Sequence, residues 1–195
     1  VAGIYDIFNH ICEQYFSGDD DNTSDYISEG LMRSVVHSSR IANVNPQDYE
    51  ARSNIMWCAA IGLNTVTGLA KEQDWEVHMI EHQLGAYTDC AHGAGLAAIS
   101  IPYYKYISPY GLDKFVRFAN NVWEIPTDTM TKEDAANAGI EKLTAFIEEL
   151  GLPQTLRELG ATEAMLPLIA NSTVQGGGYK HMTADDILNV LKACY

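Results

Sequence analysis

Basic residues are scarce in this sequence of 195 residues. Lys and Arg together number 12, against 26 Asp and Glu, and the formal net charge is -14. A charge of this sign repels the phosphates of nucleic acids and anionic lipid headgroups. The sequence also lacks any uninterrupted apolar run of the roughly 18 residues that indicate a membrane-spanning helix. We therefore expect no nucleic-acid partner and no membrane partner.

Cysteine is sparse as well. Four cysteines stand far apart, at positions 12, 58, 90 and 194, and none belongs to a Cys-x-x-Cys pair. Such pairs are typical of zinc knuckles and redox motifs, and the wide spacing does not indicate a disulfide framework. No charged segment followed by an apolar segment and a cleavage site opens the chain. These observations favour a reducing cytoplasm.

Alternating apolar and polar runs of strand length are also rare, whereas apolar residues recur at helical spacing. The sequence predicts an all-α fold, with residues 1–195 forming a single helical domain. Thr131 with Asp134, and Thr183 with Asp186, are typical of capped helix starts. The predicted helices are Val1–Phe16, Ser24–Ala42, Tyr49–Leu69, Trp75–Ala86, His92–Ile107, Gly111–Trp123, Lys132–Leu150, Glu163–Asn171 and Ala184–Ala193.

Two of these helices carry residues that disfavour a helix. The predicted helix Tyr49–Leu69 contains Gly62 and Gly68, which lower helix propensity but allow another helix to pack closely. We expect this helix to be buried nearly all round. Pro102 lies inside the predicted helix His92–Ile107, which we expect to bend or end there.

Residues that could bind a metal occur in two pairs with helical spacing. Asp6 and His10 are four residues apart, as are His78 and His82, so each pair lies on one helix face. An acid–imidazole hydrogen bond is the simpler explanation of the first pair. The second pair includes Glu81 and forms His-x-x-Glu-His, an inverted zinc-peptidase signature in which the Glu is the general base.

A third candidate ligand, His92, follows His78 by fourteen residues. On one straight helix the two would lie about 21 Å apart, whereas two nitrogens that share a metal lie within about 4.2 Å of each other. A turn between them is therefore required, and Gly85 and residues 87–89 can form it. Gly93 and Gly95 would let the following helix approach a neighbour closely.

The segments 6–10 (DIFNH), 77–86 (VHMIEHQLGA) and 91–93 (AHG) resemble the C-terminal helical domain of the iron-containing alcohol dehydrogenases. The resemblance is strongest to their butanol-dehydrogenase-like branch and extends through 50–52 (EAR), 118–123 (FANNVW) and 151–153 (GLP). It implies the helical bundle of the dehydroquinate synthase-like fold. It also implies Asp6, His10, His78 and His92 as ligands of one divalent metal, with His82 as the catalytic residue on the cofactor side.

The resemblance further implies an enzyme that interconverts primary alcohols and aldehydes with NAD(P)H. Fe²⁺ is the expected metal, with Zn²⁺ or Ni²⁺ as substitutes. The family's N-terminal nucleotide-binding domain has no counterpart in these residues, so we expect that domain as a partner. A homodimer is a further expectation. Two alternatives stay open: a zinc peptidase that uses His78, Glu81 and His82, and a non-catalytic helical metal-binding fragment.

Overall fold

The computed structural model describes residues 1–18 and 22–195, and within these ranges all regular structure is helical, which confirms the predicted fold class. Three short 3₁₀ turns accompany the α-helices, namely η1 (Val66–Gly68), η2 (Ser108–Tyr110) and η3 (Glu163–Met165). The α-helices are α1 (Ala2–Tyr15), α2 (Thr23–Val44), α3 (Tyr49–Gly62), α4 (Glu76–Thr88), α5 (His92–Ile107), α6 (Leu112–Asn121), α7 (Lys132–Glu149), α8 (Leu166–Ser172) and α9 (Ala184–Ala193).

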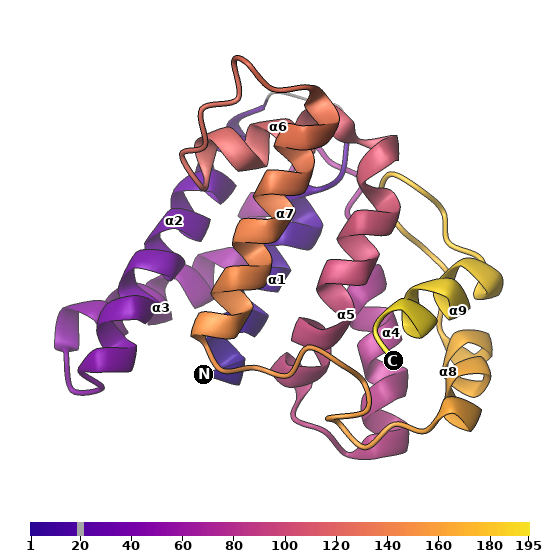
Figure 1. The fold of residues 1–195 in the computed structure, drawn as a ribbon. Helices are drawn as coiled ribbons and strands as arrows, with labels where there is room; N and C mark the ends of the chain where they lie inside the picture. The colour runs from indigo at the N-terminus through magenta and orange to yellow at the C-terminus, as the bar shows by residue number, and fades with distance from the viewer. Residues whose placement is uncertain (19–21) are drawn as a thin grey trace.

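Helix α1 occupies the centre of the bundle. It packs against α2 and α3 on one side and against α5 on the other, while α4 pairs with α5. Helix α7 pairs with α6 and crosses in front of α1, and α8 and α9 cover α4 and α5 (Figure 1). A central helix with neighbours on several sides must be apolar over most of its surface.

The sequence of α1 meets this requirement. Tyr5, Phe8, Ile11 and Tyr15 are all fully buried, and they repeat at intervals of three or four residues. Phe8 packs against Phe146 of α7, with ring centroids 5.4 Å apart. The apolar stripe thus fixes the rotation of α1 about its axis, and with it the direction in which the polar residues between the stripe positions point.

Several predicted boundaries agree with the structure. The side chain of Thr131 accepts a hydrogen bond from the Asp134 amide, and Thr183 and Asp186 form a full capping box, as expected. Helix α5 does not end at Pro102 but continues to Ile107.

The prediction for the third helix was wrong in two respects. It ends at Gly62 rather than Leu69, because the Gly62 carbonyl accepts hydrogen bonds from the side chains of Gln14 and Thr67 at 2.7 and 3.3 Å. The chain then turns away through Thr65, whose φ is +76°. The helix is also not buried all round, since it packs mainly on α1 and α2. Met56 and Trp57 remain 74% and 67% exposed.

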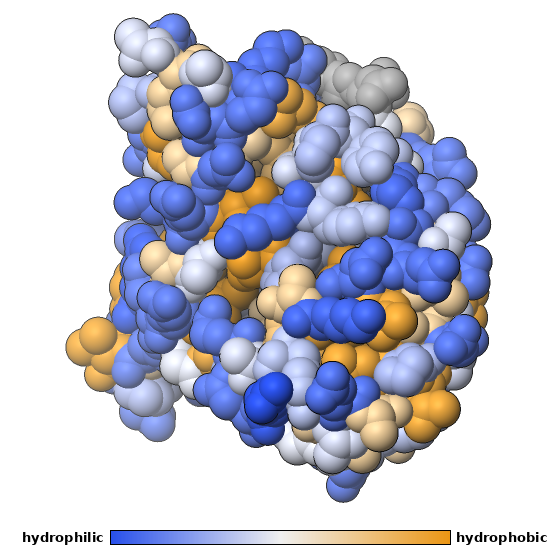
Figure 2. Space-filling model, turned by 45° about the vertical axis from the view of Figure 1, so that its right-hand side comes forward, coloured by the Kyte–Doolittle hydropathy of each residue, from blue (hydrophilic) through white to orange (hydrophobic). Residues whose placement is uncertain are grey.

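Figure 2 shows a face on which hydrophilic residues predominate and hydrophobic residues gather along a hollow. Among the described residues, no helix is both long enough and apolar enough to span a bilayer.

The junction of α1 and α5 depends on a glycine. A Cβ atom at Gly93 would overlap the backbone carbonyl of Ala2, so these two helices approach each other as closely as a residue without a side chain allows. We predict that Gly93→Ala lowers the free energy of unfolding of the metal-free protein by about 1–3 kcal/mol.

Urea unfolding followed by circular dichroism measures this change. Gly30→Ala is the matched control, because a Cβ at this helical position meets no atom within 4 Å and should be neutral or stabilising by up to about 1 kcal/mol. Equal stability of the two variants would contradict the assigned role of Gly93.

Candidate metal centre

Three of the four predicted ligands meet at one point. Asp6 comes from α1, His78 from α4, and His92 is the first residue of α5. The Oδ1 atom of Asp6 lies 3.5 Å from Nε2 of His78 and 3.5 Å from Nε2 of His92. Ligand atoms of these three residues all lie within 4.8 Å of one another. Side chains far apart in the sequence thus converge on a single small volume.

The turn that the sequence required between His78 and His92 is present. Helix α4 ends with Asp89 in the left-handed conformation, at a φ of +55°, and α5 begins three residues later. The close contact between Gly93 and Ala2 then holds the start of α5 against the start of α1. This places His92 beside Asp6, and it confirms the expected use of Gly93.

His10, the fourth predicted ligand, lies beside this group. Its Nδ1 atom is 2.8 Å from the backbone carbonyl oxygen of Asp6 and 3.0 Å from Asp6 Oδ1. Its ring centroid is 4.3 Å from that of His78. An Nδ1–H that donates to a backbone carbonyl leaves Nε2 as the atom with a free lone pair. His10 is therefore adjacent to the three convergent residues, with Nδ1 directed at Asp6.

The group contains buried polar atoms that lack hydrogen bonds. Asp6 Oδ1 and His78 Nε2 are both inaccessible to solvent, and neither makes a hydrogen bond of good geometry. Buried polar atoms are normally paired, because leaving them unpaired costs free energy. A carboxylate oxygen and imidazole nitrogens directed at one point form a donor set that suits Fe²⁺ or Zn²⁺. The residues present thus fit a divalent metal.

Behind each of two histidines stands a buried glutamate that the sequence reasoning did not assign to this site. The Glu13 carboxylate contacts Nδ1 of His78, and the Glu81 carboxylate contacts Nδ1 of His92. The sequence offered no signal for Glu13, which lies off the apolar stripe formed by Tyr5, Phe8, Ile11 and Tyr15. It offered none for the pairing of Glu81 with His92.

The electrostatics of the group follow from these contacts. Burial alone would lower the pKa of His78, but the neighbouring carboxylates of Asp6 and Glu13 raise it to about 9. Burial would raise the pKa of Asp6, but the adjacent imidazoles of His10, His78 and His92 outweigh burial and hold that pKa well below its ordinary value.

His82 lies at the edge of the group. It is exposed to solvent, and its ring centroid is 6.2 Å from that of His78 and 5.6 Å from that of His92. Burial, aided by the charges of the two neighbouring histidines, lowers its pKa. It can form a metal-binding set with Glu81 and His92, but it is outside the set that contains Asp6.

The peptidase hypothesis requires His78 and His82 as joint ligands and Glu81 as a free base. In the structure, the Glu81 side chain is buried against His92 Nδ1, and His78 Nε2 is directed at Asp6 rather than toward a point shared with His82. This geometry does not favour a peptidase.

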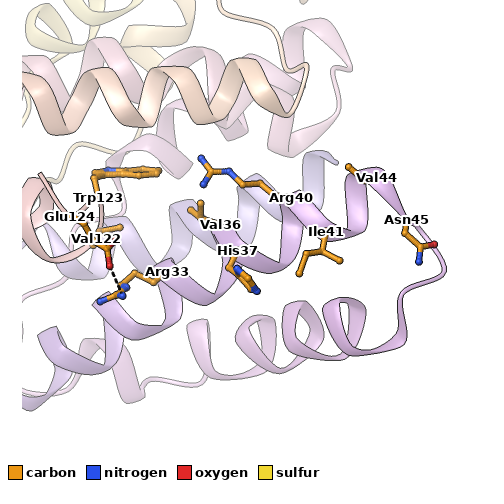
Figure 3. Close-up of a pocket in the computed structure, with 10 residues that line it drawn as sticks. All are labelled: Arg33, Val36, His37, Arg40, Ile41, Val44, Asn45, Val122, Trp123 and Glu124. Carbon is orange, nitrogen blue, oxygen red and sulfur yellow. Dashed lines mark hydrogen bonds and ion pairs between the residues drawn. The ribbon is translucent and has the colours of Figure 1, made fainter.

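The remaining candidates lie elsewhere. His181 is exposed, and Cys90 packs against the hydrophobic core. His37 lines a surface pocket between α2 and the segment after α6 (Figure 3). Two arginines on the same helix are already paired there, Arg33 with Glu124 and Arg40 with Glu149. None of the residues that line this pocket belongs to the histidine group.

Comparison with known proteins identifies the family of this chain. All 195 residues match the Fe-containing alcohol dehydrogenase family, C-terminal. NADH-dependent butanol dehydrogenase A of Clostridium acetobutylicum is 35% identical over 202 residues, which cover 100% of this chain and 52% of that protein. The chain therefore belongs to the iron-containing alcohol dehydrogenase family, and it spans about half the length of the curated relatives it matches.

Solved structures share the fold. The aldehyde reductase YqhD from Escherichia coli matches with a TM-score of 0.93 at 26% identity, over 100% of this chain and 52% of that one. The NADH-dependent butanol dehydrogenase A from Thermotoga maritima matches with a TM-score of 0.92 at 29% identity, over 99% of this chain and 51% of that one. The predicted helical domain of this family is thereby confirmed.

The positions of His78 and His82 lead to different metal contents after substitution. We predict that His78→Ala loses bound metal, because its Nε2 atom is directed at the common point, whereas His82→Ala keeps it. Elemental analysis of the two variants after mild purification measures the difference. Equal loss from both would favour the peptidase arrangement instead.

Proposed function

We propose that this chain is the metal-binding part of an NAD(P)-dependent alcohol dehydrogenase that interconverts primary alcohols and aldehydes. The observation that carries the proposal is the convergence of Asp6 Oδ1 with Nε2 of His78 and His92. Membership of the iron-containing alcohol dehydrogenase family supports the same reaction class. So do the names of two relatives, an NADH-dependent butanol dehydrogenase and an NADPH-dependent aldehyde reductase.

In this proposal Asp6, His10, His78 and His92 hold one divalent metal, with Fe²⁺ as the expected ion and Zn²⁺ or Ni²⁺ as substitutes. When bound, the metal supplies Lewis acidity at the alcohol or aldehyde oxygen, and the nicotinamide cofactor exchanges the hydride. The carboxylate of Asp6 contributes the one negative charge among the four proposed ligands, so a divalent metal together with these ligands would retain net positive charge toward a substrate oxygen.

His82 is the proposed catalytic and cofactor-side residue. It is exposed and lies next to His78 and His92 without belonging to the group around Asp6. A side chain in that position can contact a substrate or cofactor that approaches from solvent, and it can orient or relay a proton.

The proposed partner is an N-terminal nucleotide-binding domain of the same enzyme. The chain covers only about half the length of its relatives, which supports a second domain in the complete enzyme. A homodimer and a cytoplasmic location stay predictions. The partly exposed ligand face of Asp6, His10 and His92 is the side from which a cofactor held by a second domain would approach.

Substitution of the ligands tests the proposal. In the two-domain enzyme, Asp6→Ala and His92→Ala should each weaken metal binding at least about 100-fold, because loss of a direct ligand exceeds the loss of a supporting group. Alcohol oxidation should fall with metal content. Atomic absorption and turnover of 1-butanol measure the two effects, and full metal occupancy in both variants would refute the ligand set.

A second prediction concerns the 195-residue chain by itself. Because its described residues contain no strand and Gly-rich loop unit, it should bind neither NADH nor NADPH tightly and should not oxidise alcohols measurably. Isothermal titration calorimetry checks this expectation. A micromolar dissociation constant for either dinucleotide would show that the chain holds the cofactor without a second domain.

A further inference from the structure

We propose that Glu13 and Glu81 are positioning residues of the metal site, each of which fixes the orientation and tautomer of one histidine. This inference rests on the proposed function, since it concerns the same metal. It assigns a role to two carboxylates that are not themselves in the group formed by Asp6, His78 and His92.

Glu13 holds both the backbone and the ring of His78. Its Oε1 atom accepts hydrogen bonds from the amides of Val77 and His78, at 2.7 and 3.2 Å, and its Oε2 atom contacts His78 Nδ1. The N-cap residue of α4, Trp75, provides no side-chain cap of its own. Glu13 of α1 therefore caps the start of α4 from a neighbouring helix and restrains the imidazole at the same time.

A second layer of hydrogen bonds holds Glu13. Asn9 donates to Glu13 Oε2 at 3.0 Å, and its own Oδ1 accepts from Ser100 Oγ and Tyr104 Oη at 3.1 and 2.7 Å. Glu13, Asn9 and Ser100 are 0% exposed. The network connects α1, α4 and α5, the three helices that carry the proposed ligands, so it limits the movement of each ligand relative to the others.

Glu81 serves His92 in a corresponding way. It is 2% exposed, and its carboxylate contacts His92 Nδ1. The space that this carboxylate occupies exists because residue 95 is glycine: a Cβ there would lie 2.7 Å from Cγ and Oε1 of Glu81. The His92 side chain is 40% exposed, so the buried glutamate restrains a ring that solvent would otherwise leave mobile.

Both contacts select the same tautomer. A carboxylate at Nδ1 accepts a hydrogen bond from Nδ1–H, so the single ring proton of the neutral imidazole resides on Nδ1 rather than Nε2. The lone pair of Nε2 is left directed at the point shared with Asp6. Carboxylates that orient metal-bound histidines in this way typically contribute about 10- to 100-fold to metal affinity.

Co²⁺ titration of the metal-free 195-residue chain tests the inference. Absorption spectra report affinity and coordination, and proton NMR reports the shifted Nδ1–H signals of the bound histidines. We expect Glu13→Gln and Glu81→Gln to weaken Co²⁺ binding about 10- to 100-fold. We also expect each variant to increase the solvent exchange of one Nδ1–H signal only, that of His78 in the first and His92 in the second.

Glu29→Gln is the matched control. Glu29 is likewise a buried glutamate with hydrogen bonds, from Tyr15 Oη at 2.9 Å and Asn121 Nδ2 at 3.1 Å, but it has no contact with the histidines. Its replacement should lower stability while Co²⁺ affinity and both Nδ1–H signals stay as in the unmodified chain. A purely structural role for Glu13 and Glu81 would give this same result, and would overturn the inference.

Gly95→Ala is a second route to the role of Glu81 if Glu81→Gln does not fold. The added methyl group displaces the Glu81 carboxylate, so it should weaken Co²⁺ binding and alter only the His92 signal, whereas Gly30→Ala should change neither. Unmodified chain that fails to bind one Co²⁺ would refute the proposed metal site itself. If the unmodified chain binds Co²⁺ and the Glu81→Gln and Gly95→Ala variants bind it with the same affinity, only the positioning role would be refuted.

Discussion

The hydrogen bonds of the Glu13 carboxylate constrain two helices at once. They join this side chain of α1 to the backbone amides of Val77 and His78 in the first turn of α4 and to the His78 ring. A buried carboxylate is costly unless donors surround it. These donors exist only while α1 and α4 keep one spacing and one rotation. Asp6 and His10 lie on the same α1, one to two turns earlier, so their distance from His78 follows from this constraint.

Near the same end, helix α1 is also held by a second buried set of charges. Asp25 of α2 forms ion pairs with Lys71 and with Lys114, the latter at 2.6 Å, and Lys71 Nζ also donates to the last carbonyls of α1, those of Gln14 and Tyr15. Burial lowers the pKa of Lys71. The close contact between Gly93 and Ala2 holds the start of α1, so the helix is fixed at both ends. The candidate ligands in its first half therefore project from a rigid element, which suits a site that needs accurate geometry.

Burial also separates the groups of the site by role. The supporting carboxylates of Glu13 and Glu81 are in the interior, whereas Asp6, His10 and His92 are partly exposed and His82 is exposed. The interior groups can therefore keep fixed hydrogen bonds, and the outer ones are accessible from solvent. This arrangement provides both rigid support and an open side.

The sequence by itself determined the helical class, most helix boundaries and the pairs Asp6/His10 and His78/His82, because these depend on spacing along one helix. It also required a turn before His92. Only the tertiary structure decided that the third helix ends at Gly62, since side chains of other segments bind its carbonyl. The spacing of His78 and His82 does not indicate which of the two is directed at Asp6. No local sequence pattern pairs Glu13 with His78, 65 positions away. Those choices come from the packing of α1, α4 and α5, where a glycine contact and a buried carboxylate set which atoms can meet.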